Sequence, residues 1–317
     1  MFIKPSTRKF FQESKKLGRY GLAEWLHGYV YGRWLYTYIG IGTGEHWAVK
    51  TFKPFGKLIY RLFKAVTKIG DNGEKAAGVS WADAYHGKVV TLESARKLVT
   101  LNQPIKLPDL EKVIPYSRAR DIILENPDHI LVLECPCRSS RENPCLPLDV
   151  CLILGEPFFS FTLEHHPKKA RAITQAEALA IIEAENKRGH VSHAFFKDAM
   201  LDRFYAICNC CSCCCGAMNA HHHGNPMLAS SGYVCRMDQE RCVSCETCVD
   251  LCQFSAIDLQ AVQPVDEDKC MGCGVCVNSC PEEALSLELD PGKGEPLEIH
   301  NLMAQRSEAV SSEEFFT

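Results

Sequence analysis

The pattern of apolar and polar positions in the middle of the chain predicts both strands and helices. An apolar run at 129–134, bounded by turn residues, predicts a buried strand. Residues 174–187 predict a helix, because Thr174 and Glu177 form a capping box and Gly189 suits its C-terminal end. Strands mixed with helices predict an α/β or α+β layer.

Two shorter helices are predicted in the same region. Residues 91–101 carry apolar side chains on one side and Thr91 as a candidate N-cap. Residues 109–125 are expected to contain a second helix, with apolar positions at 122–124 and a break at 126–128.

Near the N-terminus, residues 55–69 have the pattern of an amphipathic helix with a basic face. The apolar residues recur at helical spacing, and the basic residues recur on the opposite side: Phe55, Leu58, Ile59, Leu62, Phe63 and Val66, against Lys57, Arg61, Lys64 and Lys68. Such a helix can bind an anionic membrane surface, pack on a partner subunit or cover the core of its own chain. The aromatic residues at 20–45 predict a half-buried segment before it.

Charge and turn residues divide the chain into regions. Residues 1–70 hold 13 Lys and Arg against 3 Asp and Glu, whereas the remainder is acidic. We expect a basic N-terminal region, a cysteine-rich domain, a C-terminal domain with repeated cysteines and a poorly ordered tail or arm, with boundaries 1–70, 71–232, 233–290 and 291–317.

The composition places the chain in a reducing compartment. It has 19 cysteines, and its first residues do not form a secretory signal. No apolar run reaches the roughly 18 residues that a membrane-spanning helix needs. We expect a cytoplasmic protein, peripheral to the inner face of the membrane if the basic helix binds lipid. No nucleic-acid-reading motif accompanies the basic charge, so nucleic acid is not an expected partner.

The most specific pattern is a cysteine run, C-x2-C-x2-C-x3-C, that occurs twice. Each cysteine of the first run recurs 28 residues later, which predicts a duplicated unit: Cys242, Cys245, Cys248 and Cys252, then Cys270, Cys273, Cys276 and Cys280. Paired C-x2-C motifs also occur in zinc knuckles, but zinc does not require an eightfold run of this kind. The fourth cysteine of each run is expected to open a helix and point away from the other three.

Residues 233–290 resemble the bacterial two-cluster ferredoxins, in which the fourth cysteine of each run ligates the other cluster. The resemblance implies two [4Fe–4S] clusters with crossed ligands: Cys242, Cys245, Cys248 and Cys280 for one, and Cys270, Cys273, Cys276 and Cys252 for the other. Cys280 is followed by the usual proline, but Cys252 is followed by Gln253. Short strands are expected at 255–259 and 284–288, one of them paired with residues 233–234.

Ten further cysteines lie in two stretches of the middle region: Cys135, Cys137, Cys145 and Cys151, then Cys208, Cys210, Cys211, Cys213, Cys214 and Cys215. Free thiols at this density would be prone to oxidation, and soft thiolates favour a metal. We predict one or more additional iron–sulfur clusters in 135–215. Adjacent cysteines point in different directions, so either two centres share the second stretch, or some thiols do not bind metal, or the centre is not a cubane. The pattern resembles that of poorly characterised iron–sulfur proteins fused to a ferredoxin domain.

Other polar residues of the middle region have ordinary interpretations as well. The histidines are more readily surface or hydrogen-bonded groups than metal ligands: His165, His166, His190, His193, His221, His222 and His223. Arg138 either tunes the thiolates beside it or forms a surface ion pair. Cys235 is expected to be a buried free thiol.

The fold class expected from these patterns is α+β, with a duplicated ferredoxin-type domain, a larger cysteine-rich domain and a basic amphipathic N-terminal region. The predicted function is single-electron transfer between redox partner proteins. The sequence has no G-x-G-x-x-G motif and no phosphate-binding loop for a nucleotide cofactor, and a chain with only clusters carries electrons between partners. The alternative is a ferredoxin-fed reductase with its own centre at the cysteine-rich loop, with Arg138, His190 and His193 as candidate proton donors or anchors. In a third interpretation, the clusters only stabilise the fold.

Overall fold

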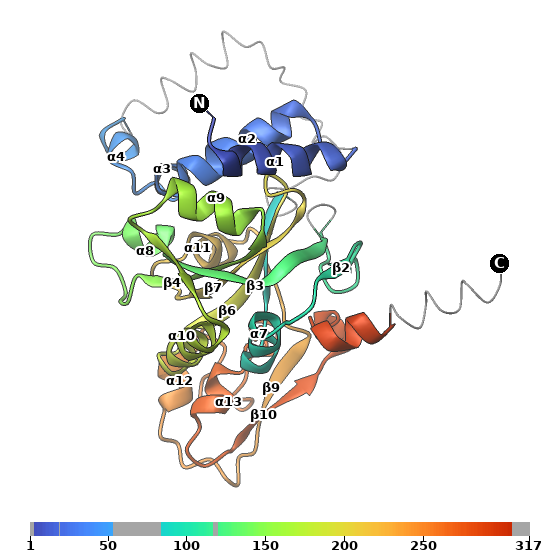
Figure 1. Cartoon of the computed structure of the whole chain (residues 1–317). Coiled ribbons are helices and arrows are strands. Elements are labelled where there is room, and N and C mark those ends of the chain that lie inside the picture. Colours follow the sequence, from blue (N-terminus) through green and yellow to red (C-terminus); the bar gives the residue numbers. More distant parts are fainter. Residues whose placement is uncertain (1–2, 19, 53–83, 117–119, 306–317) are drawn as a thin grey trace, which may run out of the picture.

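The computed structural model describes residues 3–18, 20–52, 84–116 and 120–305. Its centre is an eight-stranded, mainly antiparallel sheet in the order β2-β3-β4-β7-β6-β1-β8, with β5 pairing to β3 (Figure 1). The strands are β1 (Tyr85–Val89), β2 (Ile105–Leu107), β3 (Ile122–Glu134), β4 (Asp149–Glu156), β5 (Ala170–Ile173), β6 (Val191–Lys197), β7 (Arg203–Cys210) and β8 (Leu228–Ala229).

Helices cover both faces of this sheet. They are α1 (Pro5–Lys16), α2 (Leu22–Arg33), α3 (Leu35–Gly42), α4 (Trp47–Phe52), α7 (Leu92–Val99), α8 (Pro136–Ser139), α9 (Phe158–His165), α10 (Gln175–Lys187) and α11 (Gly216–His222). Every residue of β6 is buried, as expected for a strand covered on both sides. The α+β fold class is confirmed.

Side chains that alternate along the strands build two cores. In β3, Leu131 and Leu133 join the core that α1, α2 and α9 cover, while Ile130 and Val132 join the core beneath α7 and α10. Cys151 belongs to the first core. The thiols of the middle region therefore lie on the face of the sheet that the N-terminal helices cover.

The two capped helices form as predicted. Thr91 accepts a hydrogen bond from the backbone amide of Ser94 at the start of α7. Thr174 accepts one from the backbone amide of Glu177 at the start of α10. Gly189 follows α10 with a φ of +85°, a conformation that favours glycine. A short polar side chain at the N-cap therefore located both helix starts.

The helix predicted within 109–125 is wrong at its apolar end, because Ile122–Glu134 is one long strand, β3. Its first residues pair with β2, where Ile105 lies opposite Leu124. Three consecutive apolar residues cannot distinguish a helix from a buried strand by periodicity. The expected break at 126–128 is an irregularity within the strand, where the register shifts between Glu125 and Ile130 and Asn126 has a φ of +62°.

The C-terminal unit is built on a two-stranded antiparallel sheet of β9 (Tyr233–Met237) and β10 (Leu285–Leu289), so the predicted pairing of residues 233–234 with one of the short strands is confirmed. Residues 255–259 form only an isolated bridge, between Ile257 and Val265. Two short helices, α12 (Thr247–Leu251) and α13 (Val275–Ser279), lie between the strands.

The expectation of a poorly ordered tail is wrong for residues 295–303. Leu297 and Ile299 are buried in the core beneath α7 and α10. Lys88 Nζ donates to the Glu295 carbonyl at 2.8 Å, and Ser94 Oγ donates to Glu298 Oε1 at 2.9 Å. Two apolar side chains in a polar stretch were too weak a pattern to predict this packing.

Two predictions fall outside the described residues: the amphipathic helix at 55–69 and the domain boundary at 70–73. Among the residues that are described, no helix is long and apolar enough to cross a bilayer.

Candidate metal centres

The two cysteine runs of the C-terminal unit have the same backbone conformation. Three pairs of residues separated by 28 positions all adopt a positive φ: Ser244 and Gly272, Glu246 and Gly274, Ser255 and Glu283. At Gly272 an added Cβ would lie 2.1 Å from the Tyr233 carbonyl oxygen, so only glycine fits there. The sequence repeat is therefore a repeat of structure.

Each run wraps a cavity, and the two cavities have the crossed cysteine sets that the sequence analysis predicted. One is lined by Cys242, Cys245, Cys248 and Cys280, and the other by Cys252, Cys270, Cys273 and Cys276, together with Cys235. The cavities thus fit the predicted ligand sets.

The prediction that the fourth cysteine of each run opens a helix is wrong. Cys252 lies at the C-terminal end of α12, and Cys280 lies at the C-terminal end of α13. The backbone amides of Ala256 and Ala284 each donate to the sulfur four residues earlier, at 3.3 Å. Such donors stabilise negative charge on a thiolate and on any cluster that it binds.

Residues 236–258 and 264–286 each match the family model of the 4Fe-4S binding domain. Residues 236–286 form a 4Fe–4S ferredoxin domain. The match covers both cysteine runs, so the predicted resemblance is confirmed for this part of the chain. Searches of curated proteins and of solved structures found no match to the chain.

In the ferredoxin domain, the free thiol of Cys235 lies closer to the metal cavity than the sequence indicated. Cys235 is buried, and its sulfur is 3.6 Å from that of Cys276. Its backbone amide donates to Cys270 Sγ at 3.4 Å. The strand β9 therefore supplies a hydrogen-bond donor to one predicted ligand.

In the middle region, antiparallel strands bring the cysteines to one end of the sheet. Cys135 follows β3 and is the N-cap of α8, with its sulfur accepting from the Arg138 amide. Cys151 in β4 lies directly opposite Cys208 in β7. Since β7 runs on to Cys210, its end carries the second cysteine stretch to the same place. The register of the sheet, and not the sequence spacing, sets these neighbours.

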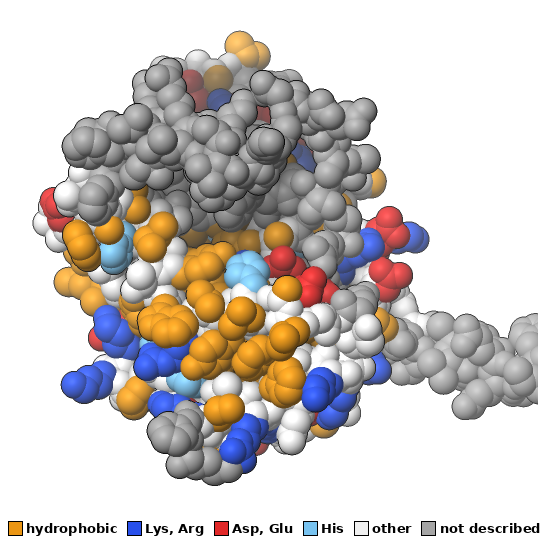
Figure 2. Space-filling model, turned by 90° about the horizontal axis from the view of Figure 1, so that it is seen from above, with side chains coloured by type: hydrophobic (Ala, Val, Ile, Leu, Met, Phe, Trp, Pro, Cys, Tyr) orange, Lys and Arg blue, Asp and Glu red, His pale blue; other side chains and the backbone are white. Residues whose placement is uncertain are grey.

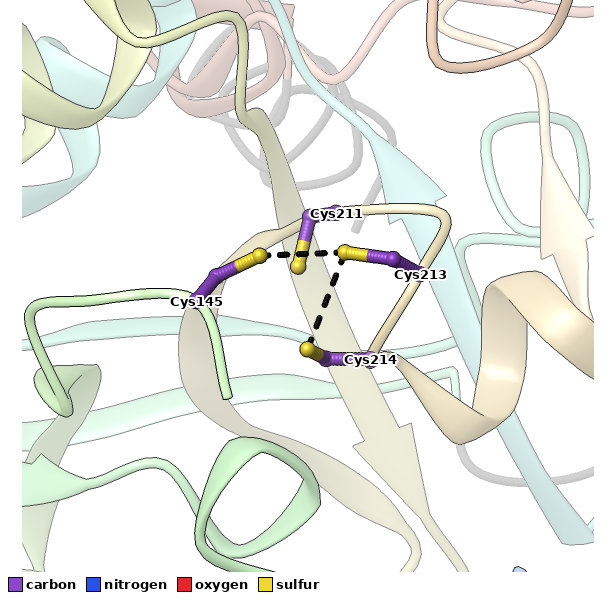
Figure 3. Close-up of side chains that lie close together, drawn as sticks. All are labelled: Cys145, Cys211, Cys213 and Cys214. Carbon is purple, nitrogen blue, oxygen red and sulfur yellow. Dashed lines mark hydrogen bonds between the residues drawn. The ribbon is translucent and has the colours of Figure 1, made fainter. Parts of the chain in front are cut away.

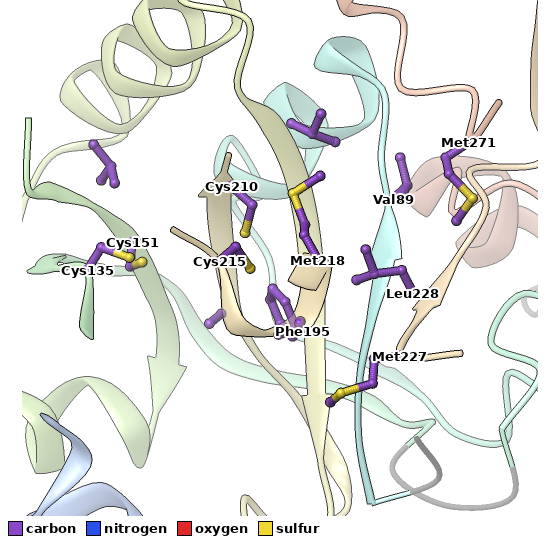
Figure 4. Close-up of a cluster of buried hydrophobic side chains, with 14 of the residues drawn as sticks. Val89, Cys135, Cys151, Phe195, Cys210, Cys215, Met218, Met227, Leu228 and Met271 are labelled. Atoms are coloured by element: carbon purple, nitrogen blue, oxygen red, sulfur yellow. The ribbon is translucent and has the colours of Figure 1, made fainter. Parts of the chain in front are cut away.

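The structure sorts the ten thiols into two groups. The larger group is a series of neighbouring thiols in which each contacts the next: Cys208, Cys151, Cys135, Cys137, Cys215 and Cys210. All six line one cavity, whose lining also includes Cys211 and Cys214, and Figure 4 shows Cys135 beside Cys151 and Cys210 beside Cys215. We refer to them as the six-thiol group.

The smaller group is Cys145, Cys211, Cys213 and Cys214. Their four sulfur atoms all lie within 4.8 Å of one another (Figure 3). Cys145 Sγ is 3.0 Å from Cys213 Sγ, which is 3.7 Å from Cys214 Sγ. We refer to them as the four-thiol group. Of the alternatives that the sequence left open, this division fits two centres that share the second cysteine stretch.

The surroundings of the six-thiol group disfavour free thiolates. The contact with Cys137, the burial of the group and the charge of Cys137 raise the pKa of Cys135 to about 12. The Cys135 thiol is therefore protonated at neutral pH unless a cation binds it. A soft metal ion or an iron–sulfur cluster is the kind of cation that removes such protons.

Arg138 forms a buried ion pair, not a surface one. Its guanidinium donates to Glu185 Oε2 at 2.7 Å, and both side chains are 1% exposed. It also donates to the carbonyls of Pro147 at 2.6 Å and Asn209 at 3.0 Å. Arg138 therefore ties together the three segments that carry Cys135, Cys151 and Cys208, within the lining of the six-thiol cavity.

The histidines have other partners. His190 Nδ1 lies 2.6 Å from Glu185 Oε2, and His165 Nε2 lies 2.9 Å from Thr7 Oγ1. His166 contacts the Gly32 carbonyl, and His193 contacts the Val191 carbonyl. Among the described residues, no histidine joins the four-thiol group. Their interpretation as ordinary hydrogen-bonding groups is the one that the contacts favour.

Aromatic residues that the sequence analysis did not select also line the six-thiol cavity. They include Tyr31, Tyr85 and Tyr205. Tyr31 Oη and Tyr205 Oη form a buried hydrogen bond of 2.8 Å. Tyr31 comes from α2, so the N-terminal helices complete the wall of this cavity. No spacing in the sequence links Tyr31 to cysteines more than 100 residues away.

The ferredoxin domain touches the cysteine-rich loop directly. The backbone amide of Ser212, between Cys211 and Cys213, donates to Gln253 Oε1 at 2.8 Å. Asn278 on α13 donates to Asn186 at the end of α10, at 3.1 Å. Gln253 is the residue that stands where the family usually has proline. The departure from the family pattern is thus a contact between the two cysteine-rich parts of the chain.

Proposed function

We propose that this chain passes single electrons through two [4Fe–4S] clusters in its ferredoxin domain and at least one further iron–sulfur centre held by the six-thiol group. It would serve as a component of a larger or membrane-associated redox system in the cytoplasm. The ferredoxin domain supports iron–sulfur electron transfer in general. The further centre, the partners and the location are the proposed parts.

The observation that carries the proposal is the hydrogen bond between Ser212 and Gln253. Gln253 follows Cys252, which lines a ferredoxin cavity, and Ser212 precedes Cys213 to Cys215, the last of which lines the six-thiol cavity. A short bonded path therefore joins one cavity to the other. Two cysteine-lined sites at such a contact are the arrangement that electron transfer within one chain requires.

A [4Fe–4S] cluster, when bound, accepts and donates one electron. The residues of this chain hold and insulate it. Amide donors from Ala256, Ala284 and Cys235 face the cysteine sulfurs, and the buried core around Val275 and Met271 excludes water. Both effects set the reduction potential of a bound cluster.

The N-terminal side is the proposed partner or membrane surface. Large apolar side chains are exposed on α2, α3 and α4: Leu22, Leu26, Trp34, Ile41 and Trp47. Figure 2 looks onto this side of the molecule and shows apolar side chains among Lys and Arg. An apolar surface with basic charge suits an anionic membrane or a partner subunit. We propose that residues 55–69 contribute to binding the same membrane or partner.

A second candidate function is that of a reductase with its own substrate site. An open pocket borders Cys137 of the six-thiol group, and its lining includes Lys197, Arg141, Tyr38 and Asn219. Lys197 is buried, with Nζ 4.9 Å from the centre of the Tyr31 ring. Lys197 lies 3.6 Å from Asp198 and Arg141 pairs with Glu45, so the pocket offers polar groups to a small acceptor while its charge is largely balanced.

Anaerobic purification with measured iron and acid-labile sulfide tests the proposal. We expect more than eight irons and more than eight sulfides per chain, and a Cys151→Ser variant should fall to eight sulfides and lose the iron that accompanies the excess sulfide. A wild-type chain with eight irons would remove the further centre. A colourless, zinc-loaded chain, or a redox titration without a reversible transition, would remove electron transfer altogether.

Electron paramagnetic resonance distinguishes the two candidate functions. The reduced chain is measured with and without a small disulfide or thiol. An unchanged signal supports a chain that only transfers electrons, because its centres are closed by thiolates. A new or shifted signal from the centre of the six-thiol group supports the reductase, because an iron then has an exchangeable ligand.

A further inference from the structure

The four-thiol group has a different size from a cluster site. Sulfur atoms at the corners of a regular tetrahedron 4.8 Å apart would lie about 2.9 Å from its centre. The bond from zinc or iron to a cysteine sulfur is about 2.3 Å long, which is most of this distance from the centre to each sulfur. The group can therefore surround one metal ion, but not a cube of four irons and four sulfides.

The distance between Cys213 and Cys214 agrees with a single central ion, whereas Cys145 Sγ and Cys213 Sγ, at 3.0 Å, are closer than a tetrahedral site holds its sulfurs. Four sulfurs bound tetrahedrally to one ion at about 2.3 Å stand about 3.8 Å apart. Cys213 Sγ and Cys214 Sγ are 3.7 Å apart, although these residues are adjacent in the chain. In a cubane each cysteine binds a different iron, which spreads the sulfurs further. The distance of 3.0 Å between Cys145 and Cys213 is longer than a disulfide bond of about 2.05 Å.

We propose that Cys145, Cys211, Cys213 and Cys214 bind one borderline-soft divalent metal ion, zinc or iron(II), in a tetrahedral site without sulfide. This site goes beyond the proposed electron transfer and lies next to the six-thiol cavity, whose lining includes Cys211 and Cys214. All four positions around the ion are occupied by sulfur, as in structural zinc sites.

The loop after β7 divides its cysteines between the two sites. Cys210 and Cys215 belong to the six-thiol group, while the three cysteines between them belong to the four-thiol group. Cys213 is exposed, so an ion can reach the site from solvent. Arg141 donates to the Cys214 carbonyl at 3.3 Å, which fixes the loop on the side of Cys145.

The ion would hold the loop in place. It joins the loop to Cys145, 68 residues earlier in the chain than Cys213, and so fixes Ser212, which bonds Gln253 of the ferredoxin domain. A closed ion of this kind orders the contact between the two redox regions without itself providing a substrate position.

Metal and sulfide analysis of the full chain, purified anaerobically, tests the site. Cys145→Ser and Cys213→Ser are expected to lose one zinc or iron per chain, with acid-labile sulfide and the ferredoxin signals in electron paramagnetic resonance unchanged. The matched control is Cys151→Ser, which should keep that ion and lose iron together with sulfide. Because the control removes a thiol of the other group, the experiment can refute either proposed site without refuting the other.

X-ray absorption of the wild-type chain keeps the proposal testable if the variants do not fold. For zinc, we expect four sulfur neighbours at about 2.3 Å and no neighbouring metal. If the ion is iron, the chain should contain one iron atom that is not matched by acid-labile sulfide. Loss of sulfide in Cys145→Ser, or a metal-free Cys145–Cys213 disulfide in the anaerobic chain, would overturn the proposal.

Discussion

The ferredoxin domain and the middle region both concentrate thiols, but they position them by different means. In the ferredoxin domain, two short runs wrap two cavities with the same backbone conformation repeated 28 residues apart. In the middle region, the thiols come from β4, β7 and the segments that follow β3 and β7, and the register of the sheet makes them neighbours. The first arrangement is local, and the second exists only when the sheet has formed.

The two regions therefore depend on different parts of the chain. The ferredoxin cavities need a tight loop and one long-range cysteine each. The six-thiol cavity needs a buried arginine, a sheet of correct register and a tyrosine from the N-terminal helices. Substitutions that act on one region and spare the other will test this difference.

The largest effect is expected from Cys273→Ser in the ferredoxin domain. This cysteine lines the cavity that Cys252 completes, so the variant should lose about four irons and four sulfides per chain. The control is Cys235→Ser, which removes a thiol near the same cavity that is not a predicted ligand. Iron content distinguishes them, and an equal loss in both would refute the assignment of ligands.

Arg138→Gln should act on the middle region alone. It leaves the buried Glu185 with only His190 and the exposed Arg188 as partners, which should cost up to about 3–5 kcal/mol of stability. Denaturant unfolding of the anaerobic chain measures this cost. The matched control is Arg188→Gln, because Arg188 contacts the same carboxylate from a 47% exposed position and should cost less than about 1 kcal/mol. Equal effects would show that the ion pair does not hold the cysteine-bearing segments.

The packing of α1 against the middle region should become less stable at low pH. Burial is the main cause that lowers the pKa of His165 to about 4, followed by Lys4 and Arg33. Because its pKa in the unfolded chain is about 6.5, the folded state favours the neutral form. This stabilisation is full above pH 6.5 and is lost as the pH falls towards 4.

At pH 5 the cost should not exceed about 2 kcal/mol relative to pH 7. Denaturant unfolding of the wild type and of His165→Gln at both values measures it, since glutamine keeps a polar contact with Thr7 but does not titrate. The same dependence in both proteins would assign the acid effect to other groups.

The smallest effect is expected at the contact between the two regions. Gln253→Leu removes the acceptor for the Ser212 amide and should cost about 1 kcal/mol, whereas Gln253→Glu keeps an acceptor oxygen. Electron transfer between the ferredoxin clusters and the middle centre, followed by rapid-freeze paramagnetic resonance, should slow in the leucine variant. Equal rates in both variants would place the electron path elsewhere.

Prediction from sequence was most successful where the determining interactions were local. Thr91 and Thr174 located two helix starts because an N-cap bonds to a backbone amide three residues later. It failed at Ile122–Leu124, where pairing with β2 decided between helix and strand. It also failed at Leu297 and Ile299, whose burial depends on a core formed by α7 and α10.

The sequence by itself determined the two ferredoxin runs, because ligand spacing within a tight loop is a property of a few consecutive residues. Only the tertiary structure decided that ten further thiols divide into groups of six and four, that Arg138 is buried between them, and that Gln253 joins the two regions. Those relations depend on strand register and on contacts between residues far apart in the chain, which no local spacing encodes.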